Sequence, residues 1–168
     1  MDITDFYSAC DHVRNLSYER ISDRNTFILV LSEQRGTCSS KHALLKALAL
    51  ENNFHSVSLC IGIYKMNSQN TAGIGSILEN YNLSFIPEAH TYLRINNEIF
   101  DVTGLQTSER SFTDSILKEL YVLPDQVGDF KVKLHQDYIR SWIKTERVPY
   151  EYEEIWNLRE QCIANLSA

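Results

Sequence analysis

The sequence predicts a single α+β domain that spans residues 1–168. Its 168 residues are 43% hydrophobic and 23% charged, a composition that suits one folded core, and no Pro- or Ser-rich linker divides them. The segment 38–52 is rich in Ala, Leu and Lys, which favours a helix. The short apolar runs 89–95 and 98–103 are joined by Asn96-Asn97, the pattern of a β-hairpin. Helical and antiparallel elements therefore occur together.

The first half of the chain alternates predicted helices and strands. Apolar residues at helical spacing predict an amphipathic helix over 2–17; they are Phe6, Cys10, Val13 and Leu16. The apolar run 27–31 is too short for its periodicity to decide between helix and strand. The helix 38–52 follows Thr37, a residue that caps helices, and ends at two Asn. The β-branched, apolar segment 57–64 predicts a buried strand.

The second half is less regular outside the hairpin. Residues 73–81 fit a short helix or a surface loop. A Ser/Thr-rich stretch follows Gly104, and the apolar alternation at 130–134 predicts a strand. A polar and apolar segment then continues to Lys144, and a last helix is predicted from about residue 151 to residue 165.

Charge and composition exclude several classes of partner. A net charge of -6 argues against a nucleic-acid-binding protein. No apolar stretch approaches the roughly 20 residues of a membrane span, and the first residues are acidic where a signal peptide is basic. The four cysteines form no C-x-x-C pair, so we expect free thiols in a reducing compartment. A cytoplasmic protein is expected, whereas its oligomeric state is not indicated.

Cys38 is predicted to lie in the first turn of a helix. There the unpaired backbone N–H groups and the positive end of the helix dipole favour a thiolate, and the same N–H groups at Cys38 and Ser39 can stabilise an oxyanion. Arg35 and Lys41 lie close by in sequence, as solvated cations or as groups that steer a carboxylate. The alternative for Cys38 is a small buried residue at a helix start.

The hairpin brings a histidine and a carboxylate together. With a two-residue turn at Asn96-Asn97, facing residues have numbers that sum to 193, so Tyr92 faces Asp101. His90 and Asp101 are then diagonal neighbours roughly 7–8 Å apart, within reach of a side-chain hydrogen bond. The alternatives are an exposed hairpin histidine and a solvated carboxylate.

The two faces of the hairpin differ in character. One carries the apolar set Leu93, Ile95, Phe100 and Val102 and is expected to face the core. The other carries the polar and aromatic set His90, Tyr92, Arg94, Asp101 and Thr103. We therefore expect a site on the second face.

Three motifs together resemble the transglutaminase-like superfamily, most closely its small bacterial members. They are Arg35-Gly-Thr-Cys-Ser-Ser-Lys-His42 before a leucine-rich helix, Glu88-Ala-His90-Thr-Tyr-Leu, and Asp101-Val-Thr-Gly104. The resemblance covers about residues 20–105. It implies a papain-like α+β fold in which the nucleophile begins a central helix packed against a small antiparallel sheet. It also implies that Cys38 is the nucleophile, His90 the general base and acid, and Asp101 the residue that orients His90.

This resemblance predicts a cysteine hydrolase (a peptidase or amidase) or an acyltransferase. An acyl-enzyme on Cys38 would form from the amide or thioester carbonyl of a peptide, a protein or a small amide, with hydrolysis preferred because water is always available. Many members have an aromatic residue where this chain has Ser39. Ser39, Gln34 and Tyr92 are the candidates for binding the oxyanion or the substrate.

Two other interpretations use the same residues. Cys38 and His42 are four residues apart on a predicted helix and could share a metal, but no second short pair supplies further ligands. No metal or cofactor is therefore expected, and the alternative for His42 is packing or capping near the helix start. The alternative for the whole protein is a catalytically silent transglutaminase-like fold that binds a peptide or a protein.

Overall fold

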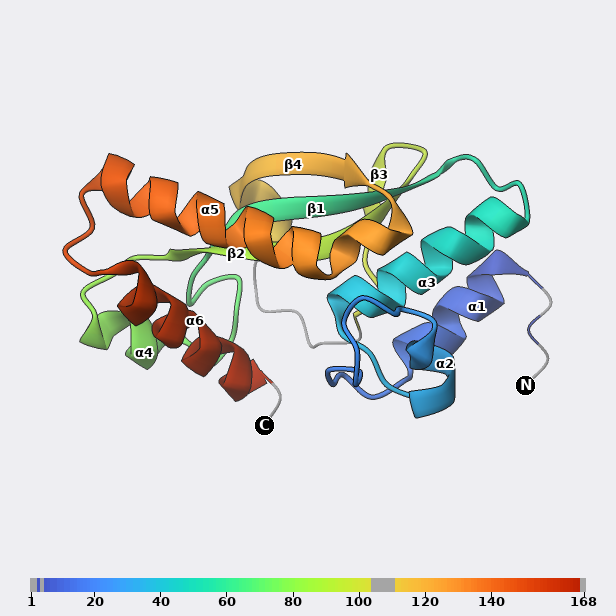
Figure 1. Cartoon of the computed structure of the whole chain (residues 1–168), viewed down its shortest axis with the longest axis horizontal. Coiled ribbons are helices and arrows are strands. Elements are labelled where there is room, and N and C mark those ends of the chain that lie inside the picture. The colour runs from blue at the N-terminus through green and yellow to red at the C-terminus, as the bar shows by residue number, and fades with distance from the viewer. Residues whose placement is uncertain (1–2, 4, 104–110, 167–168) are drawn as a thin grey trace. The chain divides into compact units, whose positions relative to one another are not determined.

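A computed structural model describes residues 3, 5–103 and 111–166 and has the expected α+β composition (Figure 1). Its strands form one small antiparallel sheet in the order β3-β2-β1-β4. The strands are β1 (Val57–Met66), β2 (Ile86–Ile95), β3 (Glu98–Phe100) and β4 (Ile116–Val122). The α-helices are α1 (Phe6–Arg14), α2 (Leu29–Glu33), α3 (Cys38–Glu51), α4 (Gly75–Asn80), α5 (Asp129–Glu146) and α6 (Tyr152–Leu166). Two short 3-10 helices are η1 (Phe112–Ser115) and η2 (Pro124–Val127).

The described residues divide into two compact units. One unit comprises the residues up to Gly62, those from His90 to Thr103 and Glu119–Lys131. The other comprises Ile63–Ala89, the residues from Ser111 to Lys118 and those from Val132 onward. The expectation of one domain stays a prediction. All the candidate site residues belong to the first unit.

Helix α3 is the centre of the first unit: α1 and α2 pack against it (Figure 1), and so does η2. It starts where predicted, because Thr37 has extended backbone angles and its N–H donates to the Ser40 hydroxyl over 3.1 Å. Gly36 precedes this cap in a crowded place, since a Cβ there would lie 2.9 Å from the Ser40 hydroxyl and 3.0 Å from Val30. The start of α3 is thus fixed by local packing.

Lys41 is buried, so of the roles considered from the sequence the solvated cation is wrong. Its side chain is fully inaccessible, and its ammonium donates to three backbone carbonyls, those of Arg14 (3.3 Å), Leu16 (2.7 Å) and Thr103 (3.2 Å). These bonds use all three donors of the ammonium group. Lys41 therefore ties the end of α1 to the chain that follows β3.

The hairpin has the predicted two-residue turn and register. Leu93 pairs with Phe100 and Ile95 with Glu98. Asn96 and Asn97 both have positive φ, 51° and 69°, which gives the turn the twist that a tight hairpin requires. Leu93 and Val102 of the predicted core face are fully buried. Tyr92, on the other face, is fully buried as well, so both faces of β2 are covered.

The second unit has its own hydrophobic core, in which Ile74, Ile86, Ile139 and Ile155 are fully buried. It also holds a buried ion pair. Arg159 donates through two nitrogens to the Glu88 carboxylate, over 2.6 and 2.7 Å. Such a two-point pair satisfies both charged groups without water.

The strand predicted at 130–134 is wrong, because this segment begins helix α5. The buried positions of α5 are Lys131, His135, Ile139 and Trp142, three or four residues apart, and two of them are polar or charged. The alternation of apolar residues at 130–134 therefore does not follow the buried face. Strand β4 was not predicted, and residues 104–110 of the Ser/Thr-rich stretch lie outside the described residues.

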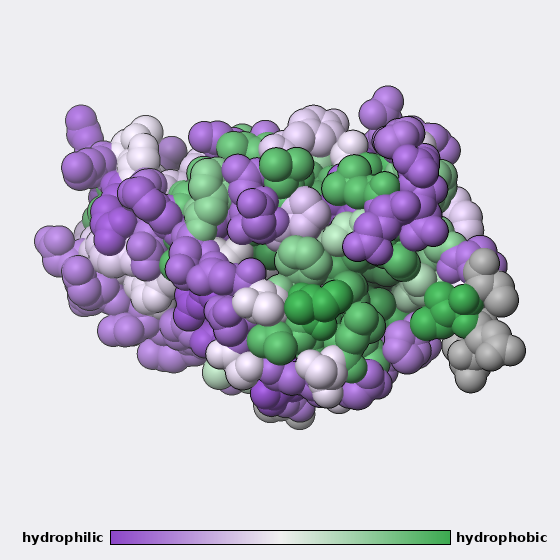
Figure 2. Space-filling view, turned by 45° about the vertical axis from the view of Figure 1, so that its right-hand side comes forward, coloured by the Kyte–Doolittle hydropathy of each residue, from purple (hydrophilic) through white to green (hydrophobic). Residues whose placement is uncertain are grey.

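On the face shown in Figure 2, hydrophobic side chains gather on one part, and hydrophilic side chains cover much of the rest. Tyr7, Ile28 and Leu31 are large hydrophobic residues with about half of their surface exposed. Among the described residues, every helix is too short or too polar to cross a bilayer.

The turn can be tested by changing Asn97. A β-branched residue at positive φ is strained, so Asn97→Val is expected to lower the free energy of unfolding by about 1–2 kcal/mol. Asn97→Gly also removes the Asn side chain but accepts positive φ, and its stability is expected to stay within about 0.5 kcal/mol of the wild type. Urea unfolding measures both. Equal stabilities of the Val and Gly variants would contradict the left-handed turn.

Candidate active site

Cys38 is the first residue of α3, as predicted. The backbone N–H groups of this first turn have no acceptor within the helix, and they lie at the positive end of the helix dipole. The side chain of Cys38 is 7% exposed, more than those of the other three cysteines, which are exposed by 1% or less. Cys38 is therefore the thiol that a small reagent reaches most easily.

His90 and Asp101 are hydrogen-bonded, as the hairpin register predicts. The distance from His90 Nε2 to Asp101 Oδ2 is 2.7 Å. The other carboxylate oxygen, Oδ1, accepts the backbone N–H of Thr103 over 2.9 Å. Because the carboxylate accepts from Nε2, that nitrogen carries the proton and Nδ1 is left to face another group.

His42 connects the helix start to the end of the hairpin. Its Nε2 accepts the backbone N–H of Val102 over 2.8 Å, so Nδ1 must carry the proton and donate to the Cys38 carbonyl over 2.7 Å. The ring is fully buried, and burial lowers its pKa to about 4, although Asp101 opposes the shift. His42 is therefore a neutral brace between Cys38 and the chain beside Asp101, in line with the packing role considered from the sequence.

A lysine that sequence reasoning did not single out also reaches the thiol. Lys131, in the first turn of α5, places its ammonium 3.5 Å from Cys38 Sγ and donates to the Ser39 hydroxyl over 2.8 Å. Its side chain is only 9% exposed. The thiol is thus surrounded by His90, by the Lys131 ammonium and by the backbone of Thr91, which also hydrogen-bonds to it.

These neighbours shift the pKa values of Cys38 and His90 in opposite directions. Burial alone would raise the pKa of Cys38, but Lys131, His90 and the Thr91 backbone outweigh it and lower that pKa. Burial would lower the pKa of His90, but Asp101 and Cys38 raise it. The pKa of Asp101 is lowered despite burial, chiefly by His90. The site therefore favours a thiolate beside an imidazolium, with the carboxylate ionised.

The remaining cysteines lack this environment. Burial raises the pKa of Cys10 and of Cys60 to about 12, and that of Cys162 to about 11. All four thiols are free. Only at Cys38 do neighbouring cations reverse the effect of burial.

Of the residues suggested for the oxyanion or the substrate, Ser39 is adjacent to the thiol. Its hydroxyl lies 3.9 Å from Cys38 Sγ and 3.4 Å from the hydroxyl of Thr91. Gln34 ends α2 with a positive φ, and its amide donates to the Leu31 carbonyl within that helix over 2.5 Å. The structure therefore brings Ser39 to the thiol and engages the Gln34 side chain elsewhere.

Tyr92 lies beside His90 but is fully buried, so it presents no surface to a substrate. The two rings are stacked with centroids 6.1 Å apart. The Tyr92 hydroxyl donates to Glu119, which also accepts from Arg94 over 2.9 Å. A Cβ at Gly62 would lie 2.9 Å from the Tyr92 ring, so the glycine makes room for it. Tyr92 therefore holds the His90 ring in place.

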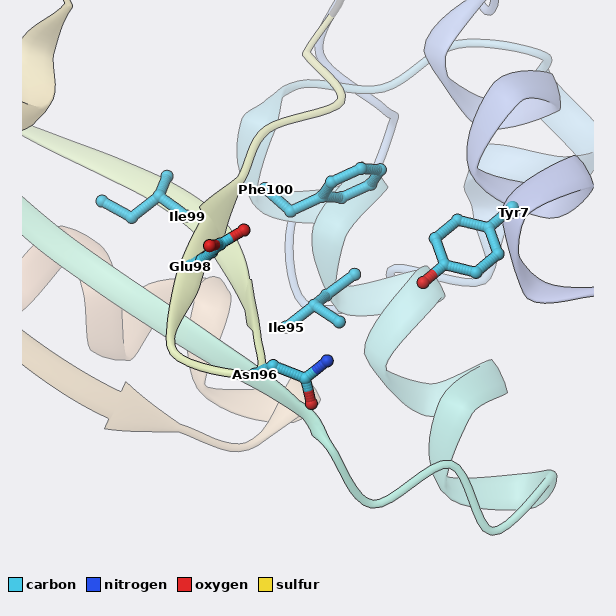
Figure 3. A pocket seen from close by; sticks show the side chains of 6 residues that line it. All are labelled: Tyr7, Ile95, Asn96, Glu98, Ile99 and Phe100. Carbon is cyan, nitrogen blue, oxygen red and sulfur yellow. The ribbon is translucent and has the colours of Figure 1, made fainter.

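A separate cavity of about 300 Å³ opens beside the hairpin turn. Figure 3 shows Ile95 and Phe100 pointing toward Tyr7, which is exposed on α1, while Ile99 points away from it. The residues that line the cavity are Tyr7, Ile95, Asn96, Glu98, Ile99 and Phe100. None of them belongs to the cysteine, histidine and aspartate cluster.

The hydrogen bonds of His42 argue against a metal ion shared by Cys38 and His42. Both nitrogens of His42 are engaged, one with the Cys38 carbonyl and one with the Val102 N–H. Within residues 3, 5–103 and 111–166, no group of three or more His, Cys, Asp or Glu side chains is arranged to hold a metal ion.

Comparison with protein-family models, curated proteins and solved structures found no match for this chain. The resemblance to the transglutaminase-like superfamily accordingly stays a prediction from the motifs around Cys38, His90 and Asp101.

The brace formed by His42 predicts a specific dependence of stability on pH. An unfolded histidine titrates near pH 6.5, whereas burial lowers the pKa of His42 to about 4. Below pH 6.5, His42 therefore binds a proton in the unfolded chain but stays neutral in the folded chain. The stability that His42 provides is lost as the pH falls toward 4. The stability advantage of the wild type over His42→Gln is expected to shrink by about 2 kcal/mol between pH 7 and pH 5.

Urea unfolding at several pH values measures this advantage. His55→Gln, which removes an exposed imidazole, is the matched control. Parallel pH profiles of the wild type and His42→Gln would contradict a buried neutral His42.

Proposed function

We propose that this protein is a cysteine hydrolase or acyltransferase that acts on an amide or thioester carbonyl through an acyl-enzyme on Cys38. The observation that carries the proposal is the convergence of three groups from separate segments. Cys38 begins a helix, His90 hydrogen-bonds to the thiol, and Asp101 accepts from the far side of the same imidazole over 2.7 Å. Nucleophilic catalysis by cysteine needs a base next to the thiol and a third group that orients the base.

The first half of the reaction follows from this arrangement. The Cys38 sulfur attacks the carbonyl carbon, a C–S bond forms, and the carbonyl π electrons move to oxygen. Backbone N–H groups at the start of α3 are candidate donors for this oxyanion. The intermediate collapses when the C–N or C–S bond of the substrate breaks and the leaving group takes the proton from His90 Nδ1.

In the second half, His90 is the base. Its neutral Nδ1 accepts a proton from water or from an amine as that nucleophile attacks the thioester carbonyl. The carboxylate of Asp101 keeps the proton on Nε2 and stabilises the imidazolium that forms. The C–S bond to Cys38 then breaks and the thiolate returns. We favour hydrolysis over acyl transfer because water needs no second binding pocket.

The papain-like, transglutaminase-like core belongs to this proposal. It is supported by the position of Cys38 at the start of a helix and by the order cysteine, histidine, aspartate along the chain. The site charges are supported by the opposite shifts in the pKa values of Cys38 and His90.

Trapping the acyl-enzyme tests the proposal. The full chain is mixed with a panel of N-acyl amino acid thioesters and peptide amides, quenched in acid after short times and analysed by intact-protein and peptide mass spectrometry. We expect a mass increase equal to the acyl group on Cys38, and none on Cys38→Ala. His90→Ala is expected to slow acylation by roughly 10²–10⁴-fold, because the general acid that protonates the leaving group is lost.

Cys162→Ala is the matched control, since it removes a buried thiol whose pKa is raised to about 11. It is expected to be acylated at the wild-type rate. An absence of adduct with every donor, together with a Cys38 that reacts with iodoacetamide no faster than Cys10, would contradict an enzyme. That result would favour the fold as a binding module for a peptide or a protein.

A further inference from the structure

Lys131 is a charged group next to the thiol that the cysteine, histidine and aspartate mechanism does not use. It comes from α5, about 30 residues after Asp101 in the sequence. Its ammonium is nearly buried, with 9% of the side chain exposed, and lies 3.5 Å from Cys38 Sγ. A buried ammonium requires compensation by hydrogen bonds and an opposite charge, since leaving it unpaired away from water is costly.

The surroundings of Lys131 show which group supplies the compensation. The Ser39 hydroxyl accepts one of its protons over 2.8 Å, and a hydroxyl carries no charge. The other described contact is Cys38 Sγ, which is anionic when the thiol is ionised. The second cation at the sulfur is His90, and Asp101 balances it from the far side of the ring.

Two further titratable groups lie near this cluster. His42 is buried and neutral, and it bonds to backbone groups on both sides of its ring. The Lys41 ammonium donates hydrogen bonds to three backbone carbonyls, and its positive charge interacts with the Asp101 carboxylate. Counted as thiolate, imidazolium, ammonium and carboxylate, the charges of Cys38, His90, Lys131 and Asp101 balance. Lys131 and His90 are the two cations next to the sulfur, whereas the charge of Lys41 acts on Asp101.

We propose that Lys131 is a fourth catalytic residue, whose ammonium stabilises the Cys38 thiolate independently of His90. The inference deepens the proposed acyl transfer and rests on it for the word catalytic. The thiolate then has two cationic partners, the Lys131 ammonium and the His90 imidazolium. Loss of the proton from His90, or loss of His90 itself, therefore leaves Cys38 ionised against Lys131. Because Lys131 keeps the thiol ionised, His90 can lose its proton to the leaving group and take one up from water without neutralising the thiolate.

The pH dependence of alkylation tests this inference without any substrate. The rate at which iodoacetamide modifies Cys38 is followed by peptide mass spectrometry from pH 4 to 10 in the full chain. Lys131→Met is expected to move the midpoint of the rate profile up by one pH unit or more. His90→Ala is expected to move it up as well, but to leave it below that of a double variant that lacks both cations.

Two variants separate charge from structure. Lys131→Arg keeps the positive charge and is expected to keep the midpoint within about half a pH unit of the wild type. Lys133→Met removes an exposed cation from the same helix, where it pairs with Asp137, and is expected to leave the profile unchanged. Lys131→Gln provides a second neutral variant if Lys131→Met does not fold.

The outcomes are distinct. A midpoint that is unchanged in the neutral Lys131 variants, or a His90→Ala profile that coincides with that of the double variant, overturns the role of Lys131. Because alkylation needs no acyl donor, a profile that depends on Lys131 supports the inference even where no donor acylates the protein. Acylation of Cys38, together with an alkylation profile that does not change in the neutral Lys131 variants, supports the proposed function and overturns only this inference.

Discussion

The register of the β2–β3 hairpin decides whether Asp101 can reach His90. Side chains on a strand alternate between faces, so a shift of one residue would place the carboxylate on the opposite face from the imidazole. The two-residue turn at Asn96 and Asn97 sets the register, and the 2.7 Å bond from His90 to Asp101 follows from it. That bond leaves Nδ1 of His90 for the thiol and counterbalances the imidazolium.

A second constraint joins this hairpin to the start of α3. His42 donates to the Cys38 carbonyl and accepts from Val102, the residue after Asp101. Lys41, the preceding residue on α3, bonds to the carbonyl of Thr103. Two adjacent buried side chains of one helix thus hold the chain that carries the carboxylate. Cys38 and the segment after Asp101 are kept in place by bonds to their backbone groups, and these bonds leave the thiol and the carboxylate free of both side chains.

Much of this site follows from the sequence, because its main parts depend on local rules. Gly36-Thr37 before an Ala- and Leu-rich segment marks a helix start, and Asn96-Asn97 between apolar runs marks a tight turn. The distance from His90 to Asp101 is then simple strand geometry. Lys131 was missed because the apolar alternation around it indicates a strand, whereas in α5 this lysine lies on the buried face. The burial of Lys41 was missed for a related reason, since its three carbonyl partners come from segments distant in sequence.

We expect Cys38 and His90 to form an ion pair in the resting protein. Nitrogen NMR of the histidine rings at pH 7 tests it most directly, with His90 assigned by its absence from His90→Ala. Both nitrogens of His90 are expected to be protonated in the wild type, and Cys38→Ser, which removes the thiolate, is expected to lower the pH at which His90 loses its proton. A neutral His90 at pH 7 whose titration is the same in the wild type and Cys38→Ser would contradict the ion pair.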